Sequence, residues 1–349
     1  MPKKILTLVL VFLLVLTGCT VQEVKPNEEP PANSFGISSR KFRTGISGFA
    51  PRDFPRFGFS DLVEYWSDVR KSAEVYGIHT EWSSLNLVED ANKELDMDFE
   101  VVLGFQEPVE WKTETDALIK AVTGMLRKYP QIKYLGIGNE INIEYENNPA
   151  DFTDFLTAYK KIYTELKALF PSVQIFTVFQ YEALKGEGYL TGFRDLRDNE
   201  FFIVNELNDH LDLIAVTLYP MLDYKSPAEI PASYFDDILS YGKKIAVTET
   251  GWMARETYAG LLKTISDDGY TGSEAEQADY LNWLIKTGNT GNFEFINWFH
   301  INDPFAWENG DEGSGNFALF DSISLKKNDG TEKKVWPLWQ ELKTVKYQN

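Results

Sequence analysis

The chain has 349 residues, of which 43% are hydrophobic and 14% aromatic, and its formal net charge at pH 7 is −19. This length and apolar content are enough for one large core or for two ordinary domains. The strongly acidic balance argues against nucleic acid and anionic membrane surfaces as partners, and it leaves neutral substrates unaffected.

The N-terminus has the pattern of a secretion signal. Lys3 and Lys4 precede an apolar run over residues 5–16, which is short for a membrane span and typical of a signal-peptide core. The run closes with LTGC (16–19), which resembles the lipobox of bacterial lipoproteins, in which the cysteine is lipidated and becomes the mature N-terminus. Cys19 is the only cysteine, so it has no internal disulfide partner.

These features predict three regions. Residues 1–18 are a lipoprotein signal peptide, and residues 19–40, which are polar and Pro-rich, form a flexible tether. Residues 41–349 are expected to be one domain, because no internal repeat or central linker is visible. The lipobox resemblance implies an extracytoplasmic bacterial protein that is lipid-anchored to the cell membrane or outer membrane, and we expect a monomer.

After the tether, short apolar segments alternate with amphipathic helical patterns. The predicted strands cover residues 42–50, 77–84, 99–105, 132–140, 173–180, 213–220, 244–252 and 293–300. Residues 150–170 show apolar side chains every three to four positions, which predicts a helix. A second helix is predicted over 272–289, where Ser273 and Glu276 form a capping box.

Eight strands, each followed by helical or loop sequence, predict an α/β fold of the (β/α)8 TIM-barrel class in a single domain. The continuous apolar character of several strands suits a parallel sheet that is covered on both faces. A doubly wound open sheet is the alternative, but the sequence lacks the GxGxxG turn that would support it.

Polar and aromatic side chains stand at the ends of these strands, and in a parallel barrel these ends converge on one face. They are Glu81, Trp82, Gln106, Asn139, Glu140, Gln180, Tyr219, Glu249, Trp252, Trp298 and His300. Aromatic rings stack on the apolar faces of sugars, and amides and carboxylates bond to hydroxyl groups. The set therefore favours a carbohydrate site.

Two carboxylates, Glu140 and Glu249, are what glycosidic-bond cleavage requires: an acid for the leaving oxygen and a base or nucleophile at the anomeric carbon. No predicted strand ends in the lysine that a Schiff-base aldolase needs, and no GxSxG elbow is present. The three histidines, His79, His210 and His300, are far apart in the sequence, so we expect no metal and no cofactor.

The segments GIGNE (136–140) and VTETGW (247–252) resemble the large clan of retaining glycoside hydrolases with (β/α)8 barrels. In that clan, a fourth-strand glutamate preceded by asparagine is the acid/base, and a seventh-strand glutamate is the nucleophile. The resemblance therefore implies that Glu140 is the acid/base, that Asn139 bonds the sugar 2-hydroxyl, and that Glu249 is the nucleophile.

Two further positions match the clan. Tyr219 in VTLYP (216–220) resembles the sixth-strand tyrosine that bonds the nucleophile, and Trp298 in INWFH (296–300) resembles the eighth-strand tryptophan that forms the floor of the −1 subsite. Within the clan, GNEIN, LYP and SEAEQADYL are most similar to the endo-β-1,4-galactanases and neighbouring endoglycanases.

The first half of the chain matches the clan less well. Many members carry an arginine near the end of strand two that supports the nucleophile, whereas residues 80–84 here read TEWSS. Either Arg43 supplies this cation from the first strand, or the family differs.

The sequence thus predicts a lipid-anchored, retaining, endo-acting hydrolase of a β-linked polysaccharide or oligosaccharide, with galactan, mannan and glucan all open. Further candidate substrate contacts are Trp82, Gln180, Trp252 and His300. A non-catalytic glycan-binding lipoprotein and a transglycosylase on the same barrel remain alternatives. The acidic, Gly-rich loop 302–316 is a candidate cleft wall, and its spacing matches no standard calcium loop.

Overall fold

The computed structural model describes residues 33–48, 62–82, 85–104, 110–143, 149–186, 199–255, 272–305 and 320–348. The predicted signal peptide with Cys19, most of the predicted tether, Gln106 and most of the loop 302–316 lie outside the described residues. Within the described ranges, no helix combines the length and apolar character needed to cross a membrane.

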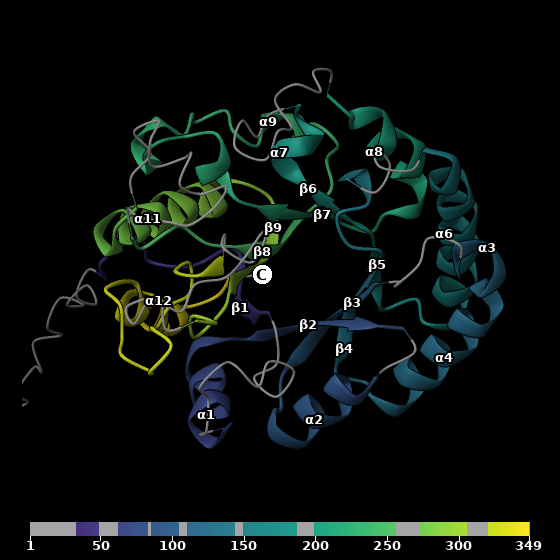
Figure 1. Ribbon diagram of the computed structural model, residues 1–349, viewed down its shortest axis with the longest axis horizontal. Coiled ribbons are helices and arrows are strands. Elements are labelled where there is room, and N and C mark those ends of the chain that lie inside the picture. Colours follow the sequence, from purple (N-terminus) through teal and green to yellow (C-terminus); the bar gives the residue numbers. More distant parts are fainter. Residues whose placement is uncertain are drawn as a thin grey trace, which may run out of the picture. The chain divides into compact units, whose positions relative to one another are not determined.

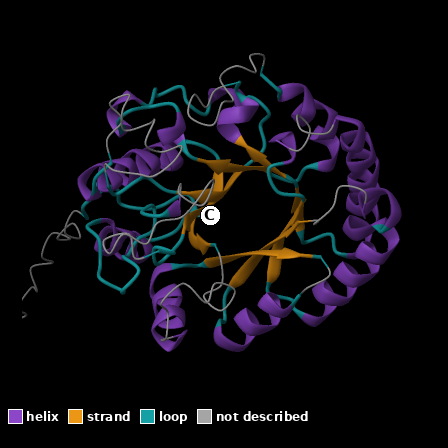
Figure 2. Cartoon of the chain, viewed as in Figure 1, coloured by secondary structure: helices purple, strands orange, loops and turns teal. Residues whose placement is uncertain are grey.

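Nine parallel strands form one sheet that curls into a nearly closed barrel (Figures 1 and 2). They are β1 (Arg43–Ser47), β2 (Val75–Glu81), β3 (Asp98–Gly104), β4 (Ile132–Ile137), β5 (Gln174–Phe176), β6 (Val178–Gln180), β7 (Ile214–Leu218), β8 (Ile245–Thr250) and β9 (Phe293–Phe299). Their order in the sheet is β5-β4-β3-β2-β1-β9-β8-β7-β6. The predicted parallel barrel is therefore confirmed in place of the open sheet.

One predicted strand, 173–180, is two strands in the structure. β5 pairs with β4, β6 pairs with β7, and Thr177 stands between β5 and β6. Each half of this segment thus contacts a different neighbour, which brings the two edges of the sheet together. Nine strands occupy the eight predicted positions, as expected of a TIM-barrel-like fold. The single-domain organisation of the whole chain stays a prediction.

Helices surround the barrel (Figure 2). The α-helices are α1 (Leu62–Ser72), α2 (Asn86–Glu94), α3 (Glu110–Thr113), α4 (Thr115–Lys128), α6 (Pro149–Leu169), α7 (Tyr181–Leu184), α8 (Phe201–Leu207), α9 (Asp236–Leu239), α11 (Glu274–Thr290) and α12 (Val335–Thr344). The predicted capping box is confirmed at α11, where Ser273 Oγ accepts the Glu276 N–H at 3.2 Å. Short 3₁₀ turns, such as η5 (Pro220–Leu222), follow some strands.

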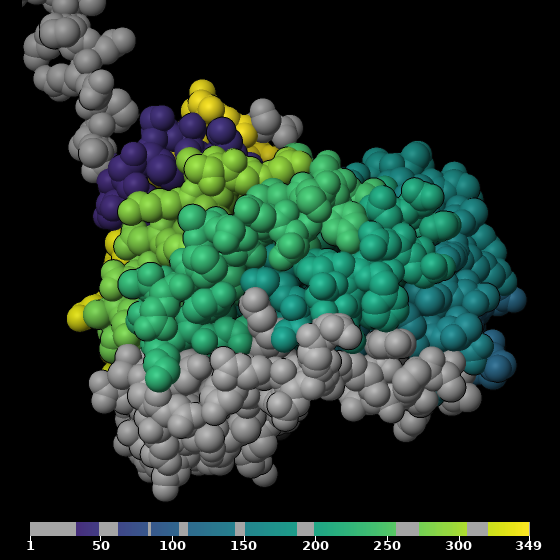
Figure 3. Space-filling model, turned by 90° about the horizontal axis from the view of Figure 1, so that it is seen from above, coloured from purple at the N-terminus to yellow at the C-terminus, as the bar shows by residue number. Residues whose placement is uncertain are grey.

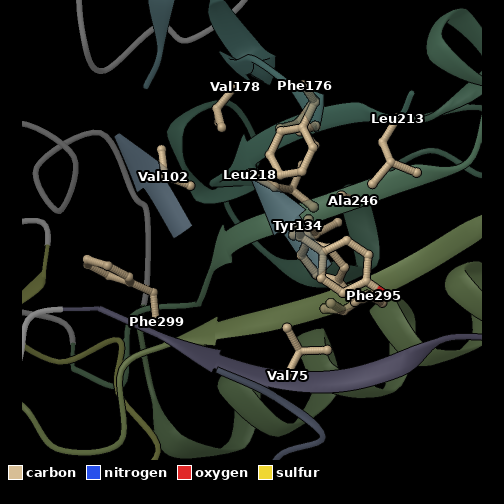
Figure 4. Packing of buried hydrophobic residues seen from close by; sticks show 14 of the residues in the cluster. Val75, Val102, Tyr134, Phe176, Val178, Leu213, Leu218, Ala246, Phe295 and Phe299 are labelled. Carbon is tan, nitrogen blue, oxygen red and sulfur yellow. The ribbon is translucent and has the colours of Figure 1, made fainter. Parts of the chain in front are cut away.

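The barrel interior holds apolar rings together with a small polar layer. Figure 4 shows Tyr134 beside Phe295 among the packed apolar side chains. Above them, Gly45 and Gly77 make room for polar groups, because a β-carbon at Gly45 would lie 1.8 Å from Asn297 Oδ1. A β-carbon at Gly77 would lie 2.9 Å from both Asn297 Nδ2 and Glu100 Oε2. Glycine is therefore needed at both positions.

The amino-terminal end of the barrel is closed by paired charges. Arg43, the first residue of β1, donates to Asp98 at 2.7 Å and to the Tyr134 hydroxyl at 3.1 Å. The Tyr134 hydroxyl donates to Glu294 at 2.8 Å, and Lys244 pairs with Glu294 at 2.6 Å. The Arg43 side chain is thus paired at the amino-terminal end of the barrel, opposite the C-terminal ends of the strands.

The two ends of the described chain lie side by side, as the purple and yellow residues of Figure 3 show. The Arg40 backbone N–H donates to the Lys346 carbonyl at 2.8 Å, and the Gln348 N–H donates to the Arg40 carbonyl at 2.7 Å. The Arg40 guanidinium, which is buried, pairs with Glu74 at 2.9 Å. This contact ties the segment before β1 to the segment after α12.

Candidate active site

Glu140 follows β4 in a turn with an unusual backbone. Gly138 and Glu140 have φ angles of 84° and 51°, in the left-handed region. A β-carbon at Gly138 would lie 2.7 Å from Ile141 and 3.0 Å from Phe155, so the turn requires glycine there. A positive φ at a glutamate is uncommon and is found where surrounding structure fixes a functional side chain.

The Glu140 side chain is half-buried, and its Oε1 accepts a hydrogen bond of 2.6 Å from the Thr217 hydroxyl. Burial, and next the negative charge of Glu249, raises the pKa of Glu140 to about 7, although the Thr217 bond opposes the rise. A carboxyl group with such a pKa still holds a proton near neutral pH and can give it to a leaving group.

Glu249 lies within β8 and is buried, and each of its carboxylate oxygens has its own partner. The Tyr219 hydroxyl donates to Oε2 at 2.7 Å, and His79 Nδ1 lies 3.0 Å from Oε1. Burial, and next the charge of Glu249, raises the pKa of Tyr219 well above its usual value, so the hydroxyl keeps its proton and donates it. Two partners from different strands thus fix the orientation of this carboxylate.

The end of β7 organises both glutamates. Thr217 lies in this strand, and Tyr219 directly follows its last residue, Leu218. Thr217 holds Glu140, Tyr219 holds Glu249, and Thr217 is the register partner of Glu249 in the β7–β8 pairing. The predicted grouping of Glu140, Glu249 and Tyr219 is therefore present in the structure.

His79 is a site residue that the sequence analysis missed. It lies on β2, two residues after the inward-facing Gly77, and this alternation could have indicated that it faces the barrel. It occupies the place beside Glu249 for which Arg43 was considered. The Arg43 alternative is wrong, because Arg43 pairs with Asp98 at the other end of the barrel.

Gln180 lies in a hydrogen-bonded network. Its Oε1 caps α7 by accepting the Ala183 N–H at 2.7 Å, and its Nε2 donates to Glu182 at 2.5 Å. Its main chain is held by Asn142, whose side chain accepts the Gln180 N–H at 2.9 Å and donates to the Gln180 carbonyl at 3.0 Å. A role for Gln180 in binding substrate stays a prediction, and its observed contacts are structural.

Trp298 is placed in the core, away from the glutamates. It is fully buried, its indole N–H donates to the Ile323 carbonyl at 2.8 Å, and its ring lies 6.0 Å from that of Tyr280 and 5.7 Å from that of Trp339. Side chains alternate along β9, so Trp298 faces α11 and α12 while its neighbour Phe299 faces the barrel interior. This placement does not support the expected stacking of Trp298 on a sugar.

Phe299 is the aromatic side chain of β9 that approaches the site. Its ring lies 6.3 Å from that of His79, the partner of Glu249, and 5.1 Å from that of Phe320. Trp252, by contrast, is fully buried and lies 5.3 Å from the Tyr280 ring in the same core region as Trp298. The structure thus gives no exposed face of Trp252 to a ligand.

The remaining candidates are Asn139, Trp82 and His300. Asn139 is half-buried beside Glu140, and its Oδ1 accepts no hydrogen bond from the described residues. Trp82 is half-buried just after β2. His300 is buried, and burial, followed by the charge of Lys333, lowers its pKa to about 3, so the imidazole is neutral.

Glu182 is a second residue that the sequence analysis missed. It is fully buried on α7, and its Oε1 accepts the Tyr219 N–H at 3.0 Å together with a hydrogen bond from the Tyr234 hydroxyl. Burial raises the pKa of Glu182 to about 7. In the part of the chain that the structure describes, no group of three or more His, Cys, Asp or Glu side chains is placed to hold a metal ion.

The chain is similar in structure to several solved glycosidases. One is a β-glucuronidase from Ruminococcus gnavus in complex with D-glucuronic acid (TM-score 0.56, 12% identity, 86% of this chain and 49% of that chain). A second is a GH2 β-galacturonidase from Eisenbergiella tayi bound to galacturonate (TM-score 0.56, 14% identity, 89% of this chain and 53% of that chain). A third is a β-D-glucuronidase from Dictyoglomus thermophilum (TM-score 0.54, 12% identity, 87% of this chain and 50% of that chain).

These likenesses concern the fold, since the sequence identities are low. The chain spans about half the length of each of the three structures. No family model matches the sequence, and no curated protein matches it.

Proposed function

We propose that this chain is a retaining glycoside hydrolase that cleaves β-linked glycans, with Glu140 as acid/base and Glu249 as nucleophile. The observation that carries the proposal is the pair itself. Glu140 bonds to Thr217 on β7 and Glu249 bonds to Tyr219 just after it, and burial, followed by the charge of Glu249, raises the pKa of Glu140 to about 7. Double displacement requires one carboxyl group that can give a proton beside a carboxylate that can attack.

In the first step, a carboxylate oxygen of Glu249 attacks the anomeric carbon, and the bond from that carbon to the leaving oxygen breaks. Glu140 gives its proton to the leaving oxygen. The resulting glycosyl ester of Glu249 is neutral, so the charge that raised the pKa of Glu140 is gone. Glu140, now a carboxylate, takes a proton from a water molecule, which attacks the same carbon and releases Glu249.

Other residues of the site orient these two groups. Tyr219 and His79 hold the Glu249 carboxylate before attack, and they fix which lone pairs face the sugar. Asn139 Oδ1, which has no partner among the described residues, belongs to the residue next to Glu140 and is available to accept a hydrogen bond from the sugar 2-hydroxyl. Such a bond contributes most to rate if it strengthens in the oxocarbenium-like transition state.

For the substrate, we propose endo-acting cleavage of a β-linked polysaccharide or oligosaccharide of the galactan type, with mannan and glucan as alternatives. The sequence resemblance to endo-β-1,4-galactanases supports this choice. Two of the solved structures named above hold D-glucuronic acid and galacturonate, so β-linked uronosides belong in any substrate test.

The experiment is a panel of β-1,4-linked galactan, mannan and glucan, with aryl β-glycosides that include the glucuronide and galacturonide. The purified full chain is compared with Glu140→Gln and Glu249→Gln by detection of new reducing ends. Polysaccharide turnover that both substitutions abolish, with aryl glycoside turnover abolished by Glu249→Gln, supports the proposal. Binding without turnover would instead favour the non-catalytic glycan-binding protein, and products longer than the substrate would favour the transglycosylase.

We also propose that the chain is exported and lipid-anchored through Cys19, in a bacterial cell membrane or outer membrane. The LTGC segment and the single cysteine support this. Cys19→Ala should release the protein from the membrane fraction, whereas Cys19 without lipid in membrane-bound protein, seen by mass spectrometry of the mature N-terminus, would contradict the anchor.

A further inference from the structure

A continuous series of hydrogen bonds runs from the segment after Glu140 to Glu249. Asn142, two residues after Glu140, bonds to the main chain of Gln180 in both directions. The Gln180 side chain donates to Glu182, and Glu182 accepts the backbone N–H of Tyr219. The Tyr219 hydroxyl then donates to Glu249. The series links the ends of β4, β6, β7 and β8 through one buried carboxylate.

Glu182 holds Tyr219 where the sheet no longer does. β7 ends at Leu218, and the Tyr219 N–H bonds to the Glu182 carboxylate at 3.0 Å instead of to a strand carbonyl. Tyr219 is only 2% exposed, and its backbone position decides where its hydroxyl lies relative to Glu249. Three donors converge on Glu182: the Tyr219 N–H, the Gln180 amide and the Tyr234 hydroxyl.

We propose that Glu182 is a positioning residue of this site, which orients Tyr219 against Glu249 and places a further buried negative charge near Glu140. The inference rests on the proposed hydrolase function and deepens it. Removal of one charge-assisted hydrogen bond from a buried network leaves a donor without its acceptor. If the network positions a reacting group, the loss lowers the catalytic rate as well as the stability.

Burial opposes the ionisation of Glu182 most and the charge of Asp223 also opposes it, whereas the hydrogen bonds from Tyr234 and Tyr219 favour it. The charge of Glu182 in turn contributes to raising the pKa of Glu140 and of Tyr280. A protonated Glu182 would carry an O–H on an oxygen that already faces a donor, so all three hydrogen bonds are accepted only when Glu182 is ionised.

The test is Glu182→Gln, which keeps the shape and removes the charge. We expect kcat to fall about tenfold, equivalent to about 1.4 kcal/mol, with little change in KM, because Tyr219 loses its fixed position. The alkaline limb of kcat/KM should also move to lower pH, since a negative charge that raises the pKa of Glu140 has been removed. A role confined to fold stability would not move this limb.

Glu294→Gln is the matched control, because Glu294 also accepts a tyrosine hydroxyl but lies at the opposite end of the barrel. It should lower the melting temperature without shifting the pH profile. Tyr234→Phe is the second variant if Glu182→Gln does not fold, and it should lower kcat in the same direction by removing one donor to Glu182.

The titration of Glu140 provides a readout that does not need turnover. In protein with ¹³C-labelled glutamate carboxyl groups, the Glu140 signal, assigned through Glu140→Gln, should titrate at lower pH in Glu182→Gln than in the wild type. An active Glu182→Gln variant with wild-type kcat, pH profile and Glu140 titration would overturn the inference and leave the proposed function standing. A wild-type chain without turnover on the whole panel would contradict the proposed function instead.

Discussion

The amino-terminal and carboxyl-terminal ends of the barrel handle charge in opposite ways. At the amino-terminal end, Arg43 meets Asp98 and Lys244 meets Glu294, so each charge lies beside its opposite. At the carboxyl-terminal end, burial and then the charge of Glu249 raise the pKa of Glu140. The first arrangement stabilises the fold. The second costs stability, and such costs are concentrated where a site needs groups in an unusual protonation state.

A cavity of about 650 Å³ lies at the amino-terminal end of the barrel, and its charged side chains have partners. Its lining includes Lys133, Lys243 and Lys244, but Lys244 is paired with Glu294, and the other two donate to backbone carbonyls. All three lysines there thus have partners. Around the glutamates, by contrast, His79 Nε2 and Asn139 Oδ1 have no hydrogen-bond partner among the described residues.

Replacement of the nucleophile should have the largest effect. Glu249→Gln prevents formation of the glycosyl ester, so kcat should fall by several powers of ten, each about 1.4 kcal/mol of barrier. Thermal unfolding should show a stability equal to or above that of the wild type, because a buried charge is removed. A variant that keeps its activity would place the chemistry elsewhere.

Removal of the acid should depend on the leaving group. Glu140→Ala should lose most of its activity on polysaccharide but less on an aryl glycoside, whose departure needs little protonation. Added azide should then restore turnover of the aryl glycoside and give a β-glycosyl azide, which mass spectrometry and NMR would identify. An α-configured azide would indicate inversion and contradict the double displacement.

The buried carboxyl group of Glu100 should make the free energy of unfolding depend on pH. Burial, and next the charge of Glu249, raises its pKa well above the usual value, so the folded state holds a proton that the unfolded state releases above about pH 4.3. Stability is therefore full in acid and is lost as pH rises toward the folded pKa, by up to about 1.4 kcal/mol per pH unit. Glu100→Gln should remove this loss, so denaturant unfolding from pH 5 to 8 should show the variant gaining on the wild type as pH rises.

The smallest effect is expected at the amino-terminal end. Arg43→Met leaves Asp98 and the Tyr134 hydroxyl without their partner, which should lower the free energy of unfolding by about 1–3 kcal/mol. Its kcat and pH profile should match those of the wild type, in contrast to those of Glu249→Gln and Glu140→Ala. A changed pH profile would mean that the two ends of the barrel are not independent.

The sequence by itself predicted the parallel barrel and the grouping of the two glutamates at one end of it. An apolar run with a polar residue at its end is a pattern of neighbouring residues, and so is the capping box at Ser273. Such local patterns can be recognised in the sequence alone. Because parallel strands all end on one face, Glu140, Tyr219 and Glu249 could be grouped without knowledge of any contact. The Gly138 turn was also visible as GIGNE, although its positive φ angles were not.

Only the tertiary structure decided the partners and the directions of the side chains. His79 reaches Glu249 across 170 positions of sequence, and Glu182 reaches Tyr219 from a different element. Trp298 packs against α11 and α12 because the register of β9 directs the side chains of its neighbours into the barrel. A register shift of one residue would direct Trp298 into the barrel and its neighbours toward the helices. Register is set by pairing between strands that are distant in the chain, so no local pattern contains it.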